Sequence, residues 1–328
     1  MKEAAFVKNN KQKWLRYEEK LKHQRDLTPD ELAQLYIDLT DDLSFARTHY
    51  PDSELVNYLN QMASGVHQGI YKNKKEEKGR FKRFWLKELP ETMATVQKAL
   101  LISFIIFMVS MTIGWVSAAN DTTFVRLILS DAYVNMTEKN IEKGDPLAVY
   151  KSMKESIMFV GITINNVMVS FRTFAAGVFT AVGTGFMIFR NGVMVGAFVE
   201  FFFEQNLGFT AIMIIMIHGT LELSAIVIAG AAGITMGNSI LFPGSYTRLE
   251  SFKRGAKKGL KIVIGLVPVF FIAGWIEGYI TRLTEMPLFL RYVIIGGSAV
   301  FILYYFIILP NKIRIDARQK EDRTLSGS

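Results

Sequence analysis

Cysteine is absent from the 328 residues of the chain. Its absence excludes disulfide bonds, a cysteine nucleophile, iron–sulfur clusters and cysteine-ligated zinc sites. The first 97 residues contain no long apolar run, so we expect no secretory signal peptide. No low-complexity tract or strong internal repeat is visible in the sequence. Membrane insertion would then depend on the first long apolar segment.

Charge is also scarce over long segments of the chain. Hydrophobic residues make up 50% of the sequence, charged residues make up 21%, and the mean hydropathy is +0.22. A bilayer core about 30 Å thick is crossed by a helix of about 20 apolar residues. The sequence therefore predicts an all-α, polytopic membrane protein of about six transmembrane helices with an N-terminal cytoplasmic helical head.

The chain divides into a head at 1–97, a transmembrane domain at 98–310 and a basic cytoplasmic tail at 311–328. Asn191-Gly192 predicts a tight turn between the second and third spans. The glycines of this region would also permit a re-entrant hairpin, which leaves five spans plus a re-entrant segment as an alternative. The predicted spans lie near 99–119, 157–189, 192–206, 209–236, 262–280 and 292–309, with an outer loop at 120–156.

Basic residues are concentrated at segments that we expect to face the cytoplasm. Residues 72–87 contain eight Lys or Arg against two acidic residues, and residues 247–261 contain six against one. The tail at 311–328 contains five against three, whereas the loop at 120–156 contains five against six. The positive-inside rule then predicts that both termini are cytoplasmic. This rule also accounts for the net charge of +8 without a nucleic-acid partner.

Residues of the head recur at helical spacing. Thr28, Pro29 and Glu31 predict a helix start with a capping box. Pro51 ends that helix, and an earlier helix carries Trp14. Three or four short helices would make a small bundle. The expected apolar stripes are Leu32, Leu35, Leu39, Leu43 and Ala46, followed by Leu55, Leu59, Met62, Val66 and Ile70.

A membrane-surface segment is predicted just before the first span. Phe81, Phe84 and Trp85 are interleaved with Lys82 and Arg83, which is typical of an amphipathic helix lying on the inner leaflet. Two interpretations stay open. The segment either senses anionic lipid or consists of ordinary snorkelling basic residues beside a span.

His218 and Glu222 lie within a predicted span and share one helix face, because they are four residues apart. Ionisable groups inside a membrane are costly and are candidate functional residues. The pair is interpreted as a structural polar lock, as a proton or substrate site, or as part of a metal site. Two ligands are too few for a metal and no HExxH motif is present, so we expect none.

The second span has a polar seam of its own. Asn165, Asn166 and Arg172 contribute to it, and Arg172 needs an acidic partner if it lies deep in the membrane. Glu200, Glu204 and Glu222 are the candidates. The pairing would either fix helix register or form a site for an anion or lipid headgroup.

Small residues at a spacing of four line the helix of His218. Ala225, Ala229, Gly233 and Gly237 would let a neighbouring helix approach closely, either within the fold or in a homodimer. In the outer loop we expect one helix to end near Gly144 and a second to start after Asp145-Pro146.

Several motifs occur together within residues 90–310. They are Asn165-Asn166, Phe174 to Gly177, Gly183-Thr-Gly185, Asn191-Gly192 with Gly196, His218-Gly219 with Glu222 and Ala225, Ala229-Gly-Ala-Ala-Gly233, and Asn140 to Pro146. With these motifs the chain resembles the integral membrane proteins grouped with stage II sporulation protein M. The long head departs from the sporulation member and favours relatives from non-sporulating organisms.

The resemblance implies a multi-pass protein of the bacterial or archaeal cytoplasmic membrane that acts as an anchor without catalysis. It implies a cell-wall enzyme or a MoxR-type AAA+ ATPase as partner, besides membrane lipid. We therefore expect a non-catalytic scaffold that forms a homo-oligomer and uses no cofactor. A transporter or lipid-handling permease is the alternative. An intramembrane hydrolase using Ser224 and His218 is a third, less favoured because the two lie on different helix faces.

Overall fold

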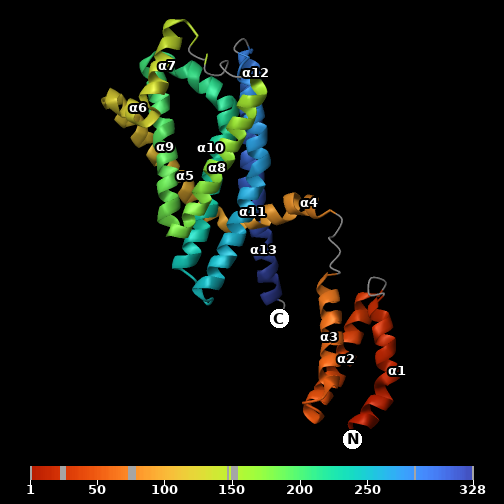
Figure 1. Cartoon of the computed structure of the whole chain (residues 1–328). Helices are drawn as coiled ribbons and strands as arrows, with labels where there is room; N and C mark the ends of the chain where they lie inside the picture. The colour runs from red at the N-terminus through yellow and green to blue at the C-terminus, as the bar shows by residue number, and fades with distance from the viewer. Residues whose placement is uncertain are drawn as a thin grey trace. The chain divides into compact units, whose positions relative to one another are not determined.

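The computed structural model of the chain describes residues 2–22, 27–72, 79–145, 148, 154–283 and 286–326. Most of these residues are helical, and none of them is in a strand, as the sequence predicts. The chain divides into two compact units, Met1–Arg80 and Phe81–Ser328. We call them the head and the membrane unit (Figure 1).

The head contains α1 (Glu3–Lys22), α2 (Pro29–His49) and α3 (Glu54–Lys72). The three helices pack around an apolar core of their own. Leu39 and Leu59 from the predicted stripes are completely buried in it. The predicted helix faces are therefore confirmed, except for Ile70, whose side chain lies outside the described part.

The start of α2 is the predicted capping box. The Glu31 backbone N–H donates to the Thr28 hydroxyl, and the Thr28 backbone N–H donates to the Glu31 carboxylate at 2.8 Å. These bonds satisfy two groups that a helix N-terminus otherwise leaves without a partner. The hydrogen bonds from Thr28 also lower the pKa of Glu31.

Polar contacts join α1 to α2 at the border of the head core. The Trp14 indole N–H donates to Asp42 at 2.8 Å, and the Tyr17 hydroxyl donates to Asp38 at 2.6 Å. The hydrogen bond from Tyr17 lowers the pKa of Asp38. The head thus combines a large-side-chain core with carboxylates at its margin.

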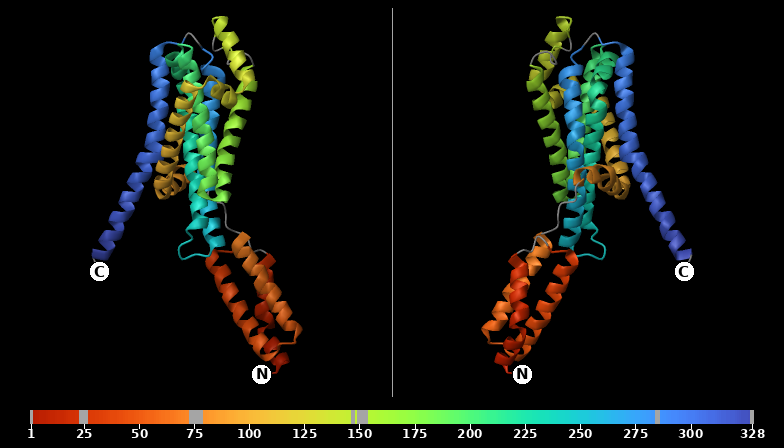
Figure 2. Two further views of the ribbon diagram at one scale, coloured as in Figure 1. Left: turned by 90° about the vertical axis from the view of Figure 1, so that its left-hand side faces the viewer. Right: turned by 90° about the vertical axis from the view of Figure 1, so that its right-hand side faces the viewer.

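The long helices of the membrane unit run side by side between its two ends (Figures 1 and 2). Short helices α6 and α7 lie at one end, and the connection from α10 to α11 lies at the other. Its elements are α4 (Arg80–Arg83), η2 (Phe84–Glu88), α5 (Leu89–Asn120), α6 (Thr122–Leu129), α7 (Asp131–Glu142), α8 (Glu155–Ala175), η4 (Ala176–Phe179), α9 (Thr180–Glu204), α10 (Gly208–Leu241), α11 (Arg248–Trp275), η5 (Ile276–Ile280), α12 (Leu288–Leu303), η6 (Tyr304–Ile308) and α13 (Leu309–Ser326).

Five helical stretches in the described part are long and apolar enough to cross a membrane. One of them, Glu155–Glu204, has 50 residues, which would be about 75 Å as a single straight helix. It is instead folded back on itself. The Thr184 hydroxyl donates to the backbone carbonyl of Thr173 at 3.1 Å, although 11 residues separate them. α8 and α9 are therefore two arms of a hairpin, and each arm is long enough to cross a bilayer core (Figures 1 and 2).

The turn of this hairpin is not where the sequence predicts it. Asn191 and Gly192 lie inside α9, where the Asn191 amide donates to the Met187 carbonyl at 2.8 Å. The chain turns at η4 and Thr180, whose φ of 66° lies in the left-handed region. The prediction of a turn at Asn191-Gly192 is wrong, because Gly192 serves close packing instead. A Cβ there would meet Phe107 and Ser110 of α5.

The small-residue stripe places α10 at the centre of the membrane unit. Ala225, Ala229, Gly233 and Gly237 are buried. A Cβ at Gly237 would meet the backbone of Thr180 and Ala181 in the hairpin turn. The predicted close packing is confirmed, and it joins helices of one chain. The stripe consequently gives no support to the predicted dimer.

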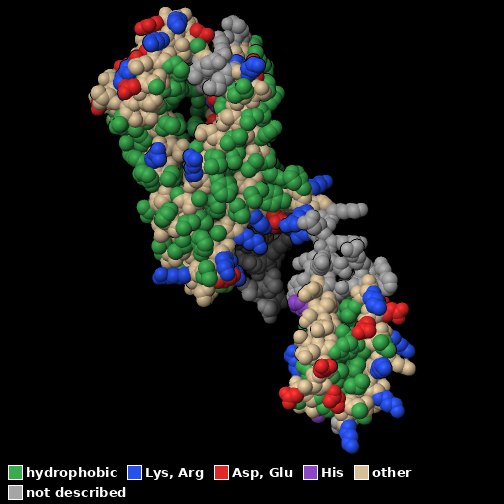
Figure 3. Space-filling model, in the orientation of Figure 1, with side chains coloured by type: hydrophobic (Ala, Val, Ile, Leu, Met, Phe, Trp, Pro, Cys, Tyr) green, Lys and Arg blue, Asp and Glu red, His purple; other side chains and the backbone are tan. Residues whose placement is uncertain are grey.

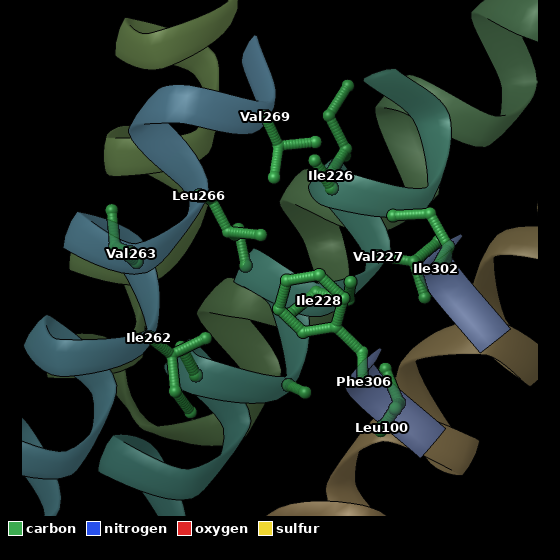
Figure 4. Packing of buried hydrophobic residues seen from close by; sticks show 14 of the residues in the cluster. Leu100, Ile226, Val227, Ile228, Ile262, Val263, Leu266, Val269, Ile302 and Phe306 are labelled. Carbon is green, nitrogen blue, oxygen red and sulfur yellow. The ribbon is translucent and has the colours of Figure 1, made fainter. Parts of the chain in front are cut away.

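Larger apolar side chains fill the space on the other sides of α10. Figure 4 shows Ile226, Val227 and Ile228 of α10 among side chains from four neighbouring elements, α5, α11, α12 and η6. Leu266 comes from α11 and Phe306 from η6. On the face shown in Figure 3, the surface of the membrane unit is mostly apolar around its middle, with a few Lys or Arg side chains there, and most of its charged side chains lie towards its ends. This is the distribution expected for a protein surrounded by lipid.

The predicted membrane-surface segment forms α4 and η2. Phe81, Lys82 and Arg83 are exposed, while Phe84 and Trp85 pack against the core of the membrane unit. Two contacts anchor the segment to later helices. The Tyr305 hydroxyl donates to the Trp85 carbonyl at 2.5 Å, and Lys261 forms an ion pair with Glu88 at 2.6 Å.

Two helices, α6 and α7, occupy the predicted outer loop. Arg126 of α6 forms ion pairs with Asp131 and Glu138 of α7 at 3.4 and 3.1 Å. α7 ends at Glu142, just before Gly144, as predicted. The second predicted helix would begin after Asp145-Pro146, where most residues lie outside the described part.

Candidate functional site

Three helical elements bring ionisable groups together inside the membrane unit. α10 provides His218 and Glu222, η5 provides Glu277, and α8 provides Asn166. One ligand atom from each of His218, Glu222 and Glu277 lies within 4.8 Å of the other two. We call these three residues the triad.

Within the triad, His218 is buried and the two glutamates are partly buried. His218 is 4% exposed, and the Glu277 side chain is 13% exposed. The His218 Nε2 atom lies 3.7 Å from a Glu277 carboxylate oxygen. The Asn166 amide donates to Glu222 Oε1 at 2.6 Å, which fixes the orientation of that carboxylate.

Thr281 orients the His218 ring from its other nitrogen. The Thr281 hydroxyl donates to the Ile276 carbonyl at 3.3 Å, so its oxygen is available as an acceptor. His218 Nδ1 lies 3.1 Å from that oxygen and can donate to it. In the tautomer that carries its proton on Nδ1, the ring donates to Thr281 and the Nε2 lone pair faces Glu277.

The comparisons with known proteins agree with this architecture. The family model described as stage II sporulation protein M matches residues 103–282, which is more than half of the chain. The chain belongs to the stage II sporulation protein M family. A second model, described as a domain of unknown function (DUF8413), matches residues 4–72. No curated protein and no solved structure matches the chain.

The part shared with the stage II sporulation protein M family contains the whole triad, together with Asn166 and Thr281. The match to DUF8413 covers α1 to α3. The two family models thus divide the chain much as its structure does, with the head in one and most of the membrane unit in the other.

Of the polar residues predicted for this site, the structure brings together His218, Glu222 and Asn166. Asn165 is exposed on α8. Glu200 lies elsewhere, in a polar cavity of about 390 Å³ between the ends of α5 and α9. Asn120, Asp121 and Glu204 also line that cavity.

Arg172 does not pair with any of its predicted partners. It is exposed, and within the described residues it forms no ion pair with Glu200, Glu204 or Glu222. The reason is the position of the hairpin turn. Because α8 ends at Ala175, Arg172 lies in its last turn, where a cation is favourable and can reach the membrane interface.

Sequence reasoning missed Glu277 and Thr281 as members of the site. Both lie at the end of the helix after α10, in or next to the π-helical turn η5. Such turns are frequent at functional sites. The one available signal was the charge of Glu277 near the end of an otherwise apolar span.

A separate apolar groove of about 780 Å³ lies between α5, α10 and the last helices. Ser224 lines this groove, whereas His218 does not, so the structure does not bring Ser224 and His218 into one site. Lys98 and Arg314 lie on its wall. Neither the groove nor the polar cavity is lined by a residue of the triad.

Proposed function

We propose that the chain is a non-catalytic membrane scaffold that holds a cytoplasmic partner and a cell-envelope partner on opposite sides of a membrane. The observation that carries the proposal is the separate apolar core of the head. A module with a core of its own can fold without help from the membrane unit to which it is attached. Such a module is well suited to bind a partner protein and hold it at the membrane.

The distribution of charge supports the proposed orientation. Lys82 and Arg83 of α4 lie in the same half of the membrane unit as the α10–α11 connection, which is followed by Arg248 and Lys253 (Figure 1). That half carries the excess of basic residues expected on the cytoplasmic side. Both termini would then be cytoplasmic, and α6 and α7 would face outward.

The partners follow from this orientation. The head would bind a cytoplasmic protein, for which the resemblance suggests a MoxR-type AAA+ ATPase. α6 and α7 would bind a cell-wall enzyme, and Leu127 of α6 is 79% exposed there. Transport is less well supported, because the two cavities described above do not reach the triad.

Crosslinking in native membranes followed by mild-detergent purification tests the proposal. The full chain is compared with a chain that begins at Gly79 and with the Leu127→Glu variant. Gly79 is the appropriate start because Trp85 and Glu88 pack within the membrane unit. We expect head removal to abolish capture of the cytoplasmic partner only, and Leu127→Glu to weaken capture of the outer partner only.

Each altered chain thereby serves as the control for the other. Capture of the same proteins by all three chains would contradict the proposal. So would a full chain that captures no protein at stoichiometric amounts under any mild condition.

A further inference from the structure

We infer that the triad binds a divalent first-row transition-metal ion, with Zn²⁺ as the representative case. This goes beyond the proposed scaffold and does not depend on it. The three ligands would be His218 Nε2 and one carboxylate oxygen each from Glu222 and Glu277. An imidazole with carboxylates and no thiolate suits zinc, manganese or ferrous iron.

The spacing of the triad fits a shared ion. Zinc lies about 2.0–2.2 Å from imidazole nitrogen and carboxylate oxygen, so two ligands of a tetrahedral site are about 3.4 Å apart. The observed 3.7 Å between His218 Nε2 and the Glu277 carboxylate is close to that separation. Small side-chain rotations would bring the Glu222 oxygen to the same distance, because all three atoms already lie within 4.8 Å.

The hydrogen bonds around the triad also favour a metal ion. In the tautomer of His218 that donates from Nδ1 to Thr281, the Nε2 lone pair faces a carboxylate oxygen of Glu277. The two facing atoms are then both acceptors, and a metal ion between them would satisfy both. Asn166 orients Glu222 through Oε1, and we assign the second carboxylate oxygen, on the side of Glu277, as the ligand of the ion. Metal ligands are usually held by outer hydrogen bonds of this kind.

Charge balance leads to the same conclusion. Two carboxyl groups lie in the apolar interior of the membrane unit, and among the described residues no Lys or Arg forms an ion pair with either of them. A buried charge is stabilised by a counterion or is neutralised. A divalent ion would neutralise both carboxylates at once, whereas a shared proton would neutralise one.

One more polar atom lies nearby without a partner. The buried Thr163 hydroxyl oxygen accepts and donates no hydrogen bond within the described residues. This hydroxyl lies against Gly274, which precedes Glu277 by three residues. Thr163 also precedes Asn166 by three residues, so the two share a face of α8. Three protein ligands leave a fourth position on zinc for a water molecule, which this hydroxyl could contact.

The experiment uses the full chain, purified in mild detergent, stripped with a chelator and titrated with Zn²⁺ and Co²⁺. Metal content, competition with a chelating dye and the visible spectrum of the Co²⁺ form are measured. We expect about one ion per chain. Glu277→Gln and His218→Gln should lower the affinity at least 100-fold, and Asn166→Ala or Thr281→Val should lower it about 10-fold.

Glu200→Gln is the matched control, because it neutralises another carboxyl group of the membrane unit and should leave the affinity unchanged. The milder Asn166→Ala and Thr281→Val keep the test decisive if a triad variant does not fold. Equal Zn²⁺ binding by the wild type and Glu277→Gln would overturn the inference. A wild-type chain that binds neither metal would also overturn it and would indicate a shared proton.

Discussion

The head and the membrane unit place the same kinds of side chain in opposite positions. In the head, large apolar residues such as Leu39 and Leu59 fill the interior, and carboxylates lie at its margin. In the membrane unit, large residues such as Phe104 and Phe186 are about half exposed, while Ala225 and Ala229 are completely buried. The buried ionisable groups are also found in this unit.

The difference reflects the solvent around each unit. Water drives large apolar side chains into the head, because the hydrophobic effect is proportional to the apolar area removed from water. Lipid provides no such drive, so helices of the membrane unit associate through close packing of small residues and polar contacts. The stability of the head should therefore be most sensitive to substitutions that remove side-chain volume. The stability of the membrane unit should be most sensitive to substitutions that add side-chain volume.

The largest effect is expected from removing volume in the head. Leu39→Ala should destabilise the head by about 2–5 kcal/mol, because a completely buried leucine leaves a cavity. Ile37→Ala is the control on the same helix, and it should change stability by less than about 0.5 kcal/mol, since Ile37 is 51% exposed. Hydrogen exchange of α1 to α3 in the full chain measures both. Equal protection in the two variants would contradict the assigned core.

Added volume in the membrane unit should have the next largest effect. Gly237→Ala should destabilise it by about 1–3 kcal/mol, because the new Cβ meets the backbone of Thr180 and Ala181. Gly297→Ala is the matched control within a helix, since nothing lies within 4 Å of a Cβ there. Thermal unfolding in mild detergent compares them. The packing described for α10 would be wrong if both substitutions were harmless.

The smallest effect concerns the polar margin of the head. Tyr17→Phe removes the hydrogen bond that lowers the pKa of Asp38 and should reduce stability by about 0.5–1.5 kcal/mol at neutral pH. A carboxyl group whose pKa is lower in the folded state than in the unfolded state stabilises the fold at pH values above its unfolded pKa. This stabilisation is lost as the pH falls through the lowered pKa of the folded state. The difference in stability between wild type and variant should therefore disappear below about pH 4.

Hydrogen exchange of α1 and α2 over a pH series measures the difference in stability between wild type and Tyr17→Phe. Tyr36→Phe is the control, because the Tyr36 hydroxyl forms no hydrogen bond within the described residues. A difference in stability that does not change with pH would mean that Tyr17 acts through packing alone.

The sequence predicts the features that depend on one helix at a time. The cap at Thr28, the stripes of the head, the small residues of α10 and the shared face of His218 and Glu222 all follow from local spacing. Each is decided by helical periodicity or by hydrogen bonds between near neighbours. The structure confirms these predictions for the residues that it describes.

Features that depend on which helices meet could not be predicted in the same way. Asn191-Gly192 has the composition of a turn, but its glycine serves contact with α5. The real turn uses Thr180 at positive φ, a conformation that a threonine rarely adopts. Because the sequence predicts the turn too late in the chain, it also predicts that Arg172 lies too deep in the membrane. The contact between Glu277 and His218 joins two different helical elements, so residue spacing within one helix does not predict it.

We propose that the chain presents its head on one side of the membrane and α6–α7 on the other, with α8 and α9 as separate crossings. Because the chain contains no cysteine, single-cysteine variants can be labelled with an impermeant maleimide without background. Lys143→Cys should react in intact cells. Thr48→Cys, Phe179→Cys and Lys253→Cys should react only after permeabilisation. Labelling of Phe179→Cys or Thr48→Cys in intact cells would contradict the account.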